Sequence, residues 1–233
     1  MSREDVGQRC VPLDRTHVFA ASVVCLKDQR LFDSLLDTVS PARWQRVCSL
    51  RSKADQCLSL GVEILLKKSL ESLDIPLFPV ERDPWGKPYA VGREDVHFNL
   101  SHAGERVLCA VSPMPVGCDV EVINPRHARL GDRYFCPSEQ NFIREGQTEA
   151  ERLERFYRLW TVKESFIKAV GRGLSLPMKD FCVAEADGGM SVSHTVDQGV
   201  YRAWEYGFDD GYRYAVCGLC DRCEDVVWVD LSL

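Results

Sequence analysis

The sequence has 233 residues, of which 45% are hydrophobic and 27% are charged, and its formal net charge is −6. This composition is typical of a soluble globular protein with room for one large domain or two small ones. The negative charge disfavours nucleic acid as the main partner, because nucleic-acid binders usually carry a basic stripe. No apolar run is long enough to cross a membrane, and the polar start MSREDVGQRC does not have the form of a signal peptide.

The first half of the sequence alternates apolar runs with clusters of turn residues. Short runs rich in β-branched residues predict buried strands, and apolar residues at helical spacing predict helices. Ser40–Pro41 has the form of a helix N-cap followed by proline at the first helical position. The elements expected in this half are a strand at 17–26, helices at 28–38 and from 41 to about 73, a proline-rich loop at 76–88, and strands at 96–100 and 107–111.

The second half repeats the order of helices followed by strands. Each half is of a size to form a small α+β subdomain, so the predicted fold class is α+β, with domains at 1–114 and 115–233 joined near Pro113–Pro115. The elements expected in the second half are a strand at 116–123, helices at about 125–146 and 151–170, and strands near 181–186, 191–196, 199–207, 212–219 and 225–231.

The sequence contains eleven cysteines, several of them inside apolar runs. Because no export signal is visible, we expect free thiols in a reducing cytoplasm rather than a disulfide framework. Cys217, Cys220 and Cys223 have the spacing of part of a zinc or iron–sulfur site. A fourth ligand is absent nearby, so a thiolate metal protein ranks last among the hypotheses.

Two carboxylates, Asp119 and Glu121, lie within the sequence Gly117-Cys-Asp-Val-Glu121 on the strand expected at 116–123. Residues two apart on a strand point to the same face. One interpretation is an edge strand with its polar face in water. The other is a site for a hard cation, which would relieve the repulsion between the two acids. Oxygen ligands without a nearby histidine suit Mg²⁺.

Trp160, Glu164 and Lys168 are spaced four residues apart on the helix expected at 151–170, so they share one face. Such a Glu–Lys pair is commonly a solvated pair on the helix surface. If the helix packs against the strand at 116–123, Glu164 becomes a third carboxylate. Lys163 and Lys168 would then supply positive charge for a phosphate-bearing substrate, a combination suited to phosphoryl-type transfer. Trp160 is predicted to pack the helix in place.

Further candidate phosphate ligands lie in the first half. Ser101 and His102 end the strand expected at 96–100, although a single histidine in a turn is more often structural. Arg43, Arg46 and Arg51 lie on or near one helix, where the alternatives are a phosphate pocket and a solvated basic face.

Taken together, these motifs resemble the 4′-phosphopantetheinyl transferases, in the surfactin-synthetase-activating (Sfp-type) branch. The motifs are Gly86-Lys-Pro88, Phe98-Asn-Leu-Ser-His102, Gly117-Cys-Asp-Val-Glu121, Trp160-Thr-Val-Lys-Glu-Ser-Phe-Ile-Lys168 and Gly171-Arg-Gly-Leu-Ser-Leu-Pro177. The resemblance runs from about Ser40 to Phe181. It implies a fold of two similar α+β halves related by a pseudo-twofold axis, with the active site in the cleft between them, in a monomer.

The resemblance also implies a reaction. The phosphopantetheine arm of coenzyme A is transferred to a serine of an apo acyl or peptidyl carrier protein, and adenosine 3′,5′-bisphosphate is released. The roles implied by the resemblance are Mg²⁺ binding by Asp119, Glu121 and Glu164, catalysis by Asp119, Glu164 and Lys168, and coenzyme A binding by Arg43, Arg46, Lys87, Ser101, His102 and Lys163. The alternative is a catalytically silent module that binds coenzyme A or a carrier protein.

Overall fold

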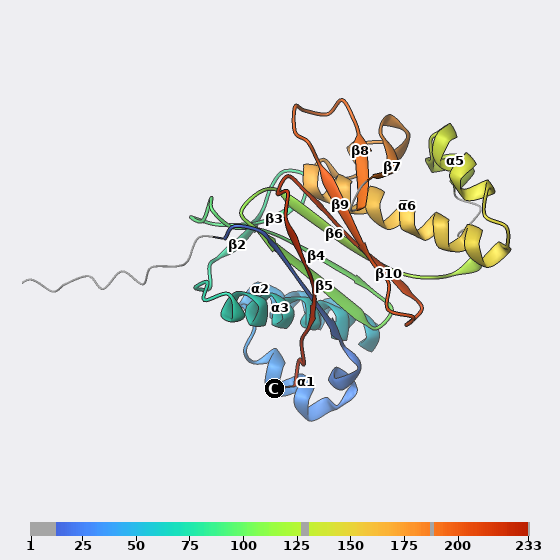
Figure 1. The fold of residues 1–233 in the computed structure, drawn as a ribbon. Coiled ribbons are helices and arrows are strands. Elements are labelled where there is room, and N and C mark those ends of the chain that lie inside the picture. The colour runs from blue at the N-terminus through green and yellow to red at the C-terminus, as the bar shows by residue number, and fades with distance from the viewer. Residues whose placement is uncertain (1–12, 127–130, 187–188, 233) are drawn as a thin grey trace, which may run out of the picture.

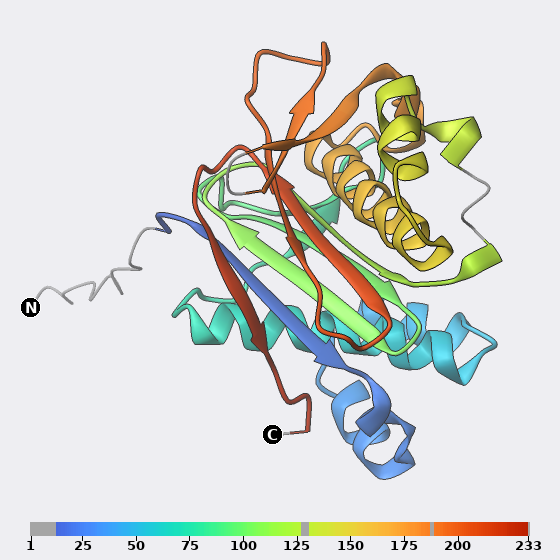
Figure 2. The same cartoon turned by 45° about the vertical axis from the view of Figure 1, so that its right-hand side comes forward.

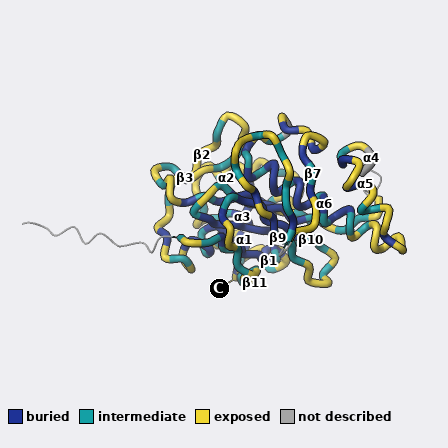
Figure 3. Tube along the Cα trace, turned by 45° about the horizontal axis from the view of Figure 1, so that its top comes forward, coloured by how far each residue is buried: buried dark blue, intermediate teal, exposed yellow. Residues whose placement is uncertain are grey.

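The computed structural model describes residues 13–126, 131–186 and 189–232. Two β-sheets pack face to face, and a long helix covers the outer face of each (Figures 1 and 2). The layers are therefore helix, sheet, sheet and helix, and buried residues are concentrated in the strands and long helices (Figure 3). This arrangement agrees with the predicted α+β class. None of the helices in the described ranges is long and apolar enough to span a membrane.

Helices pack on the first sheet in the N-terminal half. The helix expected from 41 to about 73 is two helices, because Ser52 begins a new one by accepting a hydrogen bond from Asp55 N on its Oγ at 3.4 Å. The cap at Ser40 is confirmed, with Oγ 3.3 Å from Arg43 N. The elements are β1 (Thr16–Ser22), α1 (Gln29–Leu36), α2 (Pro41–Ser49), α3 (Lys53–Ser72), the hairpin β2 (Val80–Arg82) and β3 (Pro88–Ala90), β4 (His97–Ala103) and β5 (Arg106–Ser112).

In the second half, the helix expected at 125–146 is two short helices separated by Phe135 and Cys136, and part of its range lies outside the described residues. The other predicted elements are present with small shifts of their ends. They are β6 (Val116–Val122), α4 (Gly131–Tyr134), α5 (Pro137–Arg144), α6 (Glu149–Val170), β7 (Cys182–Ala186), β8 (Gly189–Ser193), β9 (Arg202–Tyr206), β10 (Tyr212–Gly218) and β11 (Cys223–Trp228).

The last strand returns to the first half of the molecule. The first sheet has the order β11-β1-β5-β4 and the second the order β6-β10-β9-β8-β7. β11 runs parallel to β1, with Val226 opposite Val18. The sequence placed this strand in the second half. An apolar alternating run predicts a strand but does not specify its partner, so the pairing is visible only in three dimensions.

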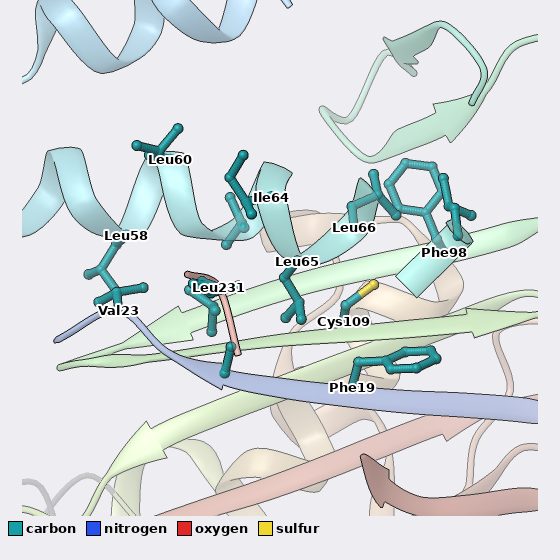
Figure 4. Packing of buried hydrophobic residues seen from close by; sticks show 14 of the residues in the cluster. Phe19, Val23, Leu58, Leu60, Ile64, Leu65, Leu66, Phe98, Cys109 and Leu231 are labelled. Atoms are coloured by element: carbon teal, nitrogen blue, oxygen red, sulfur yellow. The ribbon is translucent and has the colours of Figure 1, made fainter. Parts of the chain in front are cut away.

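Alternation along the strands sorts side chains between the layers. Residues facing inward fill the core between the sheets: Val18, Ala20, Leu108, Ala110, Val116, Cys118, Val120, Tyr214 and Val216. Outward residues of the first sheet face α3, where Leu65 packs near Phe19 and Cys109 (Figure 4). On β6 the outward residues are Gly117, Asp119 and Glu121. The two carboxylates therefore lie on the face covered by α6.

Cys136 and Cys182 form a disulfide that links the N-cap of α5 to the first residue of β7. The prediction of free thiols is wrong for this pair. The other cysteines in the described ranges are free, and Cys10 lies outside those ranges. In the described part of the chain, no group of three His, Cys, Asp or Glu side chains is placed to hold a metal ion as it stands. A metal site at residues 217, 220 and 223, the hypothesis that ranked last, gains no support from the described residues.

Candidate active site

Strand β6 and helix α6 approach closely because residue 117 is glycine. A Cβ atom at this position would lie 2.1 Å from Ser165 O and 2.3 Å from Ala169 N. Both distances are far below van der Waals contact, so any side chain here would push the helix off the strand. The close approach brings the carboxylates of β6 against the face of α6 that carries Glu164 and Lys168.

Lys168 bridges the helix to the strand. Its Nζ lies 2.6 Å from Asp119 Oδ1 and donates to Ser101 Oγ at 2.9 Å and to Cys118 O at 3.1 Å. Burial raises the pKa of Asp119, against the opposing effect of the ammonium group. Burial by itself lowers the pKa of Lys168, but Asp119, Cys118 and Glu164 together outweigh burial and the net shift is upward. The surface pair expected between Glu164 and Lys168 is replaced by this ion pair across the two elements.

Ser101 and His102 are consecutive on β4 and point in opposite directions. The Ser101 side chain is buried, and its hydroxyl donates to Asp119 Oδ1 at 3.0 Å. It therefore lies behind the carboxylate, where it orients Asp119 and Lys168, and its contact with a coenzyme A phosphate stays a prediction. His102 is exposed on the other side and lines a cavity.

Glu121 and Glu164 interact electrostatically with the Asp119–Lys168 ion pair. Asp119 is 4% exposed, and its Oδ2 is buried without a hydrogen-bond partner among the described residues. Burial, followed by the charge of Asp119, raises the pKa of Glu121 to about 7. The same two causes raise the pKa of Glu164. The three acids do not form a complete set of metal ligands. However, a carboxylate oxygen without a hydrogen-bond partner, near two acids whose pKa values are raised, fits a hard cation that keeps several water ligands.

Trp160 has a polar contact that its spacing did not reveal. Its ring stacks on Phe156 at 5.6 Å between centroids and meets Tyr134 edge-on at 5.7 Å. The predicted packing role is consistent with these contacts. In addition, the indole Nε1 donates to Glu121 Oε1 at 3.3 Å and so holds the second carboxylate of the strand.

Lys163 does not reach the cleft, which contradicts its predicted role in binding coenzyme A. Its side chain is 0% exposed and its Nζ lies 2.8 Å from Glu139 Oε1. It also donates to Met178 O at 2.9 Å and to Phe181 O at 2.7 Å. Consecutive helical residues are about 100° apart, so Lys163 faces the interior of the second half while Glu164 faces the strand. The sequence analysis did not identify Glu139, although its place three residues after Cys136, the N-cap of a helix that begins with proline, indicates a capping residue.

A cavity of about 790 Å³ lies between α2, α3, the β2–β3 hairpin and β4. Its polar lining includes Ser40, Arg43, Glu63, Lys67 and His102, and the rest of the lining is largely apolar. Arg43 was predicted to face a ligand phosphate, and this position agrees with that role. Arg46 is exposed and does not line the cavity, so of these two arginines Arg43 faces it.

A second, smaller cavity of about 230 Å³ lies at the seam between the halves, between the loop around Lys87, strand β4 and the end of α6, and Lys168 lines it. Lys87 closes the seam, because its Nζ donates to Ala169 O at 2.7 Å and to Val116 O at 3.2 Å. Asn99 adds another link, with its Oδ1 accepting from Cys118 N at 2.9 Å. The cleft between the halves is thus fastened by side chains of the loop and of β4.

Burial lowers the pKa of Lys87 to about 8 from 10.5, and this shift has a consequence for stability. Between these two values the unfolded chain binds a proton that the folded protein does not, so the stability contributed by this position rises with pH. The free energy of unfolding of the wild-type protein minus that of Lys87→Met should therefore increase with pH. We expect this difference to be about 3 kcal/mol larger at pH 10.5 than at pH 8. Urea unfolding of both proteins at several pH values measures this. A constant difference between the two would contradict the assignment.

Comparisons with known proteins show the family of this chain. The family model of the 4′-phosphopantetheinyl transferase superfamily matches residues 115–217, which contain β6 and α6. The 4′-phosphopantetheinyl transferase Sfp of Bacillus subtilis (strain 168) is 31% identical over 202 residues, which are 84% of this chain and 90% of that protein. The 4′-phosphopantetheinyl transferase gsp of Aneurinibacillus migulanus is 30% identical over 197 residues, 82% of this chain and 81% of that one.

Among solved structures, the holo-[acyl-carrier-protein] synthase of Thermotoga maritima aligns with a TM-score of 0.40 and 24% identity, over 47% of this chain and 64% of that one. The identity to Sfp extends over nearly the whole length of both proteins, including both sides of the seam. The chain therefore belongs to the 4′-phosphopantetheinyl transferase superfamily, in its Sfp-type branch, and is a 4′-phosphopantetheinyl transferase.

Proposed function

We propose that this transferase moves the 4′-phosphopantetheine arm of coenzyme A to a serine hydroxyl of an apo carrier protein, with the chemistry at Asp119, Glu164 and Lys168. The serine oxygen bonds to the phosphorus that carries the pantetheine arm. The bond from that phosphorus to the bridging oxygen of the pyrophosphate breaks, and adenosine 3′,5′-bisphosphate leaves. The observation that carries this proposal is the convergence of two acids and one lysine from β6 and α6 on one wall of the seam.

Glu164 is the proposed base for the serine proton. It is partly exposed on the cleft side of α6, and burial together with the neighbouring Asp119 raises the pKa of its carboxyl. Lys168 keeps its positive charge because the Asp119 carboxylate stabilises it, and it is available to neutralise negative charge on the departing bisphosphate.

Asp119, Glu121 and Glu164 are the proposed holders of Mg²⁺. When bound, this cation would neutralise the charge of the pyrophosphate. The free Oδ2 of Asp119 and the raised pKa values of the two glutamates support a cation at this place. Water and phosphate oxygens would complete the shell, as Mg²⁺ usually requires. Ser101 and Trp160 orient Asp119 and Glu121 through their hydrogen bonds.

Coenzyme A is proposed to lie across the seam, with its 3′-phosphate near Arg43 and His102 and its pyrophosphate toward Lys168. Both cavities have basic residues in their lining, and they share Pro88 and Leu100, so they adjoin each other. The partner that accepts the arm is proposed to be an acyl or peptidyl carrier protein. We also propose that the protein acts as a monomer, because one chain supplies both sides of the seam, and that it acts in the cytoplasm.

The test is a transfer assay. The purified protein is incubated with coenzyme A, Mg²⁺ and several apo carrier proteins, and each carrier is weighed by mass spectrometry. We expect the mass of one phosphopantetheine group to be added, and we expect chelation of the cation to stop the addition. No gain on any carrier, together with tight binding of coenzyme A, would favour the alternative of a silent binding module.

The substitution Glu164→Gln tests whether Glu164 acts as the base or only contributes to the binding of coenzyme A. The substitution keeps the size of the side chain but removes the proton acceptor, so kcat is expected to fall roughly 10²-fold while coenzyme A still binds. The measurement is single-turnover transfer beside calorimetric binding. Glu154 lies ten residues before Glu164 on the same helix and pairs with Arg213, and Glu154→Gln is the matched control that should retain transfer. A Glu164→Gln variant with near-normal transfer would remove Glu164 from the mechanism.

A further inference from the structure

Glu63 is the one carboxylate among the residues that line the 790 Å³ cavity. It lies on α3, and its side chain is 13% exposed. Neither the sequence motifs nor the proposed chemistry gives it a role. An acid in a pocket proposed for a phosphate is unexpected, since a carboxylate repels a phosphate and weakens its binding.

The contacts of Glu63 fix the arginine of the cavity. Its Oε2 accepts from Arg43 Nε at 2.9 Å, and its Oε1 accepts from Ser40 N at 2.8 Å. Ser40 is the N-cap of α2, so one carboxylate holds both the start of that helix and the side chain of Arg43. Ser59 Oγ, 3.3 Å from Arg43 Nη1, holds the guanidinium group from a second side.

Glu63 and Ser59 bind Nε and Nη1 of Arg43. Among the described residues, Nη2 has no hydrogen-bond partner, so this nitrogen is available to a ligand. An arginine held in this way loses little freedom when it binds a phosphate, because its orientation is already set. The negative charge of Glu63 also lowers the net positive charge of the cavity. Lys67 Nζ lies 3.8 Å from Glu63 Oε1, so the acid offsets part of the positive charge that Arg43 and Lys67 present to the cavity.

We propose that Glu63 is a positioning residue that orients Arg43 toward the 3′-phosphate of coenzyme A and limits the affinity for that phosphate. This inference rests on the proposed function, since it takes coenzyme A to be the ligand of the cavity. Glu63 acts on the ligand in two opposing ways. Its hydrogen bonds favour phosphate binding by ordering Arg43, and its negative charge disfavours binding of the dianionic group.

Two substitutions separate these effects. Glu63→Gln keeps an oxygen acceptor but removes the charge, and we expect it to bind coenzyme A about fivefold more tightly than the wild type. The gain should be less than about twofold for 3′-dephospho-coenzyme A, which lacks the repelled group. Glu63→Ala removes the acceptors as well, so it should bind coenzyme A more weakly than Glu63→Gln. In the transfer assay the glutamine variant should change KM more than kcat.

The measurement is calorimetric titration of the full-length protein with each ligand at two salt concentrations, and the gain of Glu63→Gln should shrink at high salt. Glu71→Gln is the matched control, because Glu71 is exposed on the same helix two turns away and does not line the cavity. It should leave both affinities unchanged.

Two results would overturn the inference. In the first, the ratio of the affinities for coenzyme A and 3′-dephospho-coenzyme A is the same in Glu63→Gln as in the wild type. This would show that the charge of Glu63 does not act on the 3′-phosphate. In the second, Glu63→Ala binds coenzyme A as tightly as Glu63→Gln. This would show that Glu63 does not position Arg43 for binding. A wild-type protein that binds neither ligand would instead overturn the proposed function, and the inference with it.

Discussion

Asp119→Asn is expected to lower kcat/KM for transfer by roughly 10³-fold while the protein remains folded. Asp119 is the acid that contacts Lys168, and its Oδ2 is the orphaned oxygen proposed to face the cation. The amide keeps the shape of the side chain but removes the charge that holds both groups. The fold should survive, because Lys168 is 28% exposed and keeps its contacts with Ser101 and Cys118.

The second sheet provides a matched control for this substitution. Asp119 on β6 and Glu205 on β9 lie on either side of Ala215, which is on the strand between them, β10. Each of the two acids forms an ion pair with a basic residue of α6. Glu205 contacts Arg158, away from the seam. Glu205→Gln should therefore transfer at close to the wild-type rate. The mass of the carrier over time measures the rate of transfer, and the circular dichroism of each variant shows whether it is folded. Equal losses of transfer in both variants would mean that Asp119 acts only by holding the helix.

Gly117→Ala is expected to lower the free energy of unfolding by about 3 kcal/mol and to reduce transfer to near background. The added methyl group would collide with backbone atoms of Ser165 and Ala169, which cannot rotate away as a side chain would. The helix must shift outward, and Lys168 then moves away from Asp119. Urea unfolding and the transfer assay measure the two effects.

Gly211→Ala distinguishes this collision from a general effect of losing glycine. Gly211 has a φ of +80°, and a Cβ there would meet nothing within 4 Å. Its substitution should cost only the strain of the left-handed backbone, about 1 kcal/mol, and should leave transfer intact. If Gly117→Ala were as mild as Gly211→Ala, the close packing of β6 and α6 would not be what assembles the site.

Several features of this protein followed from the sequence because their causes are local. The spacing of Asp119 and Glu121 put them on one face of a strand, and the spacing of Trp160, Glu164 and Lys168 put them on one face of a helix. Ser40 followed by proline specified the start of a helix, and the order of apolar runs indicated an α+β fold. Patterns of this kind depend only on the geometry of strands and helices.

The tertiary structure decided which of these residues work together. Lys163 and Glu164 are neighbours in one motif, yet the helix turns the first into the core against Glu139 and the second toward the cleft. The partner of Lys168 is Asp119 rather than Glu164, because Gly117 lets the strand come close. The joining of β11 to β1 likewise brings together segments far apart in the chain. Spacing fixes the face on which a residue lies, but contacts across a seam depend on long-range packing, which no local pattern records.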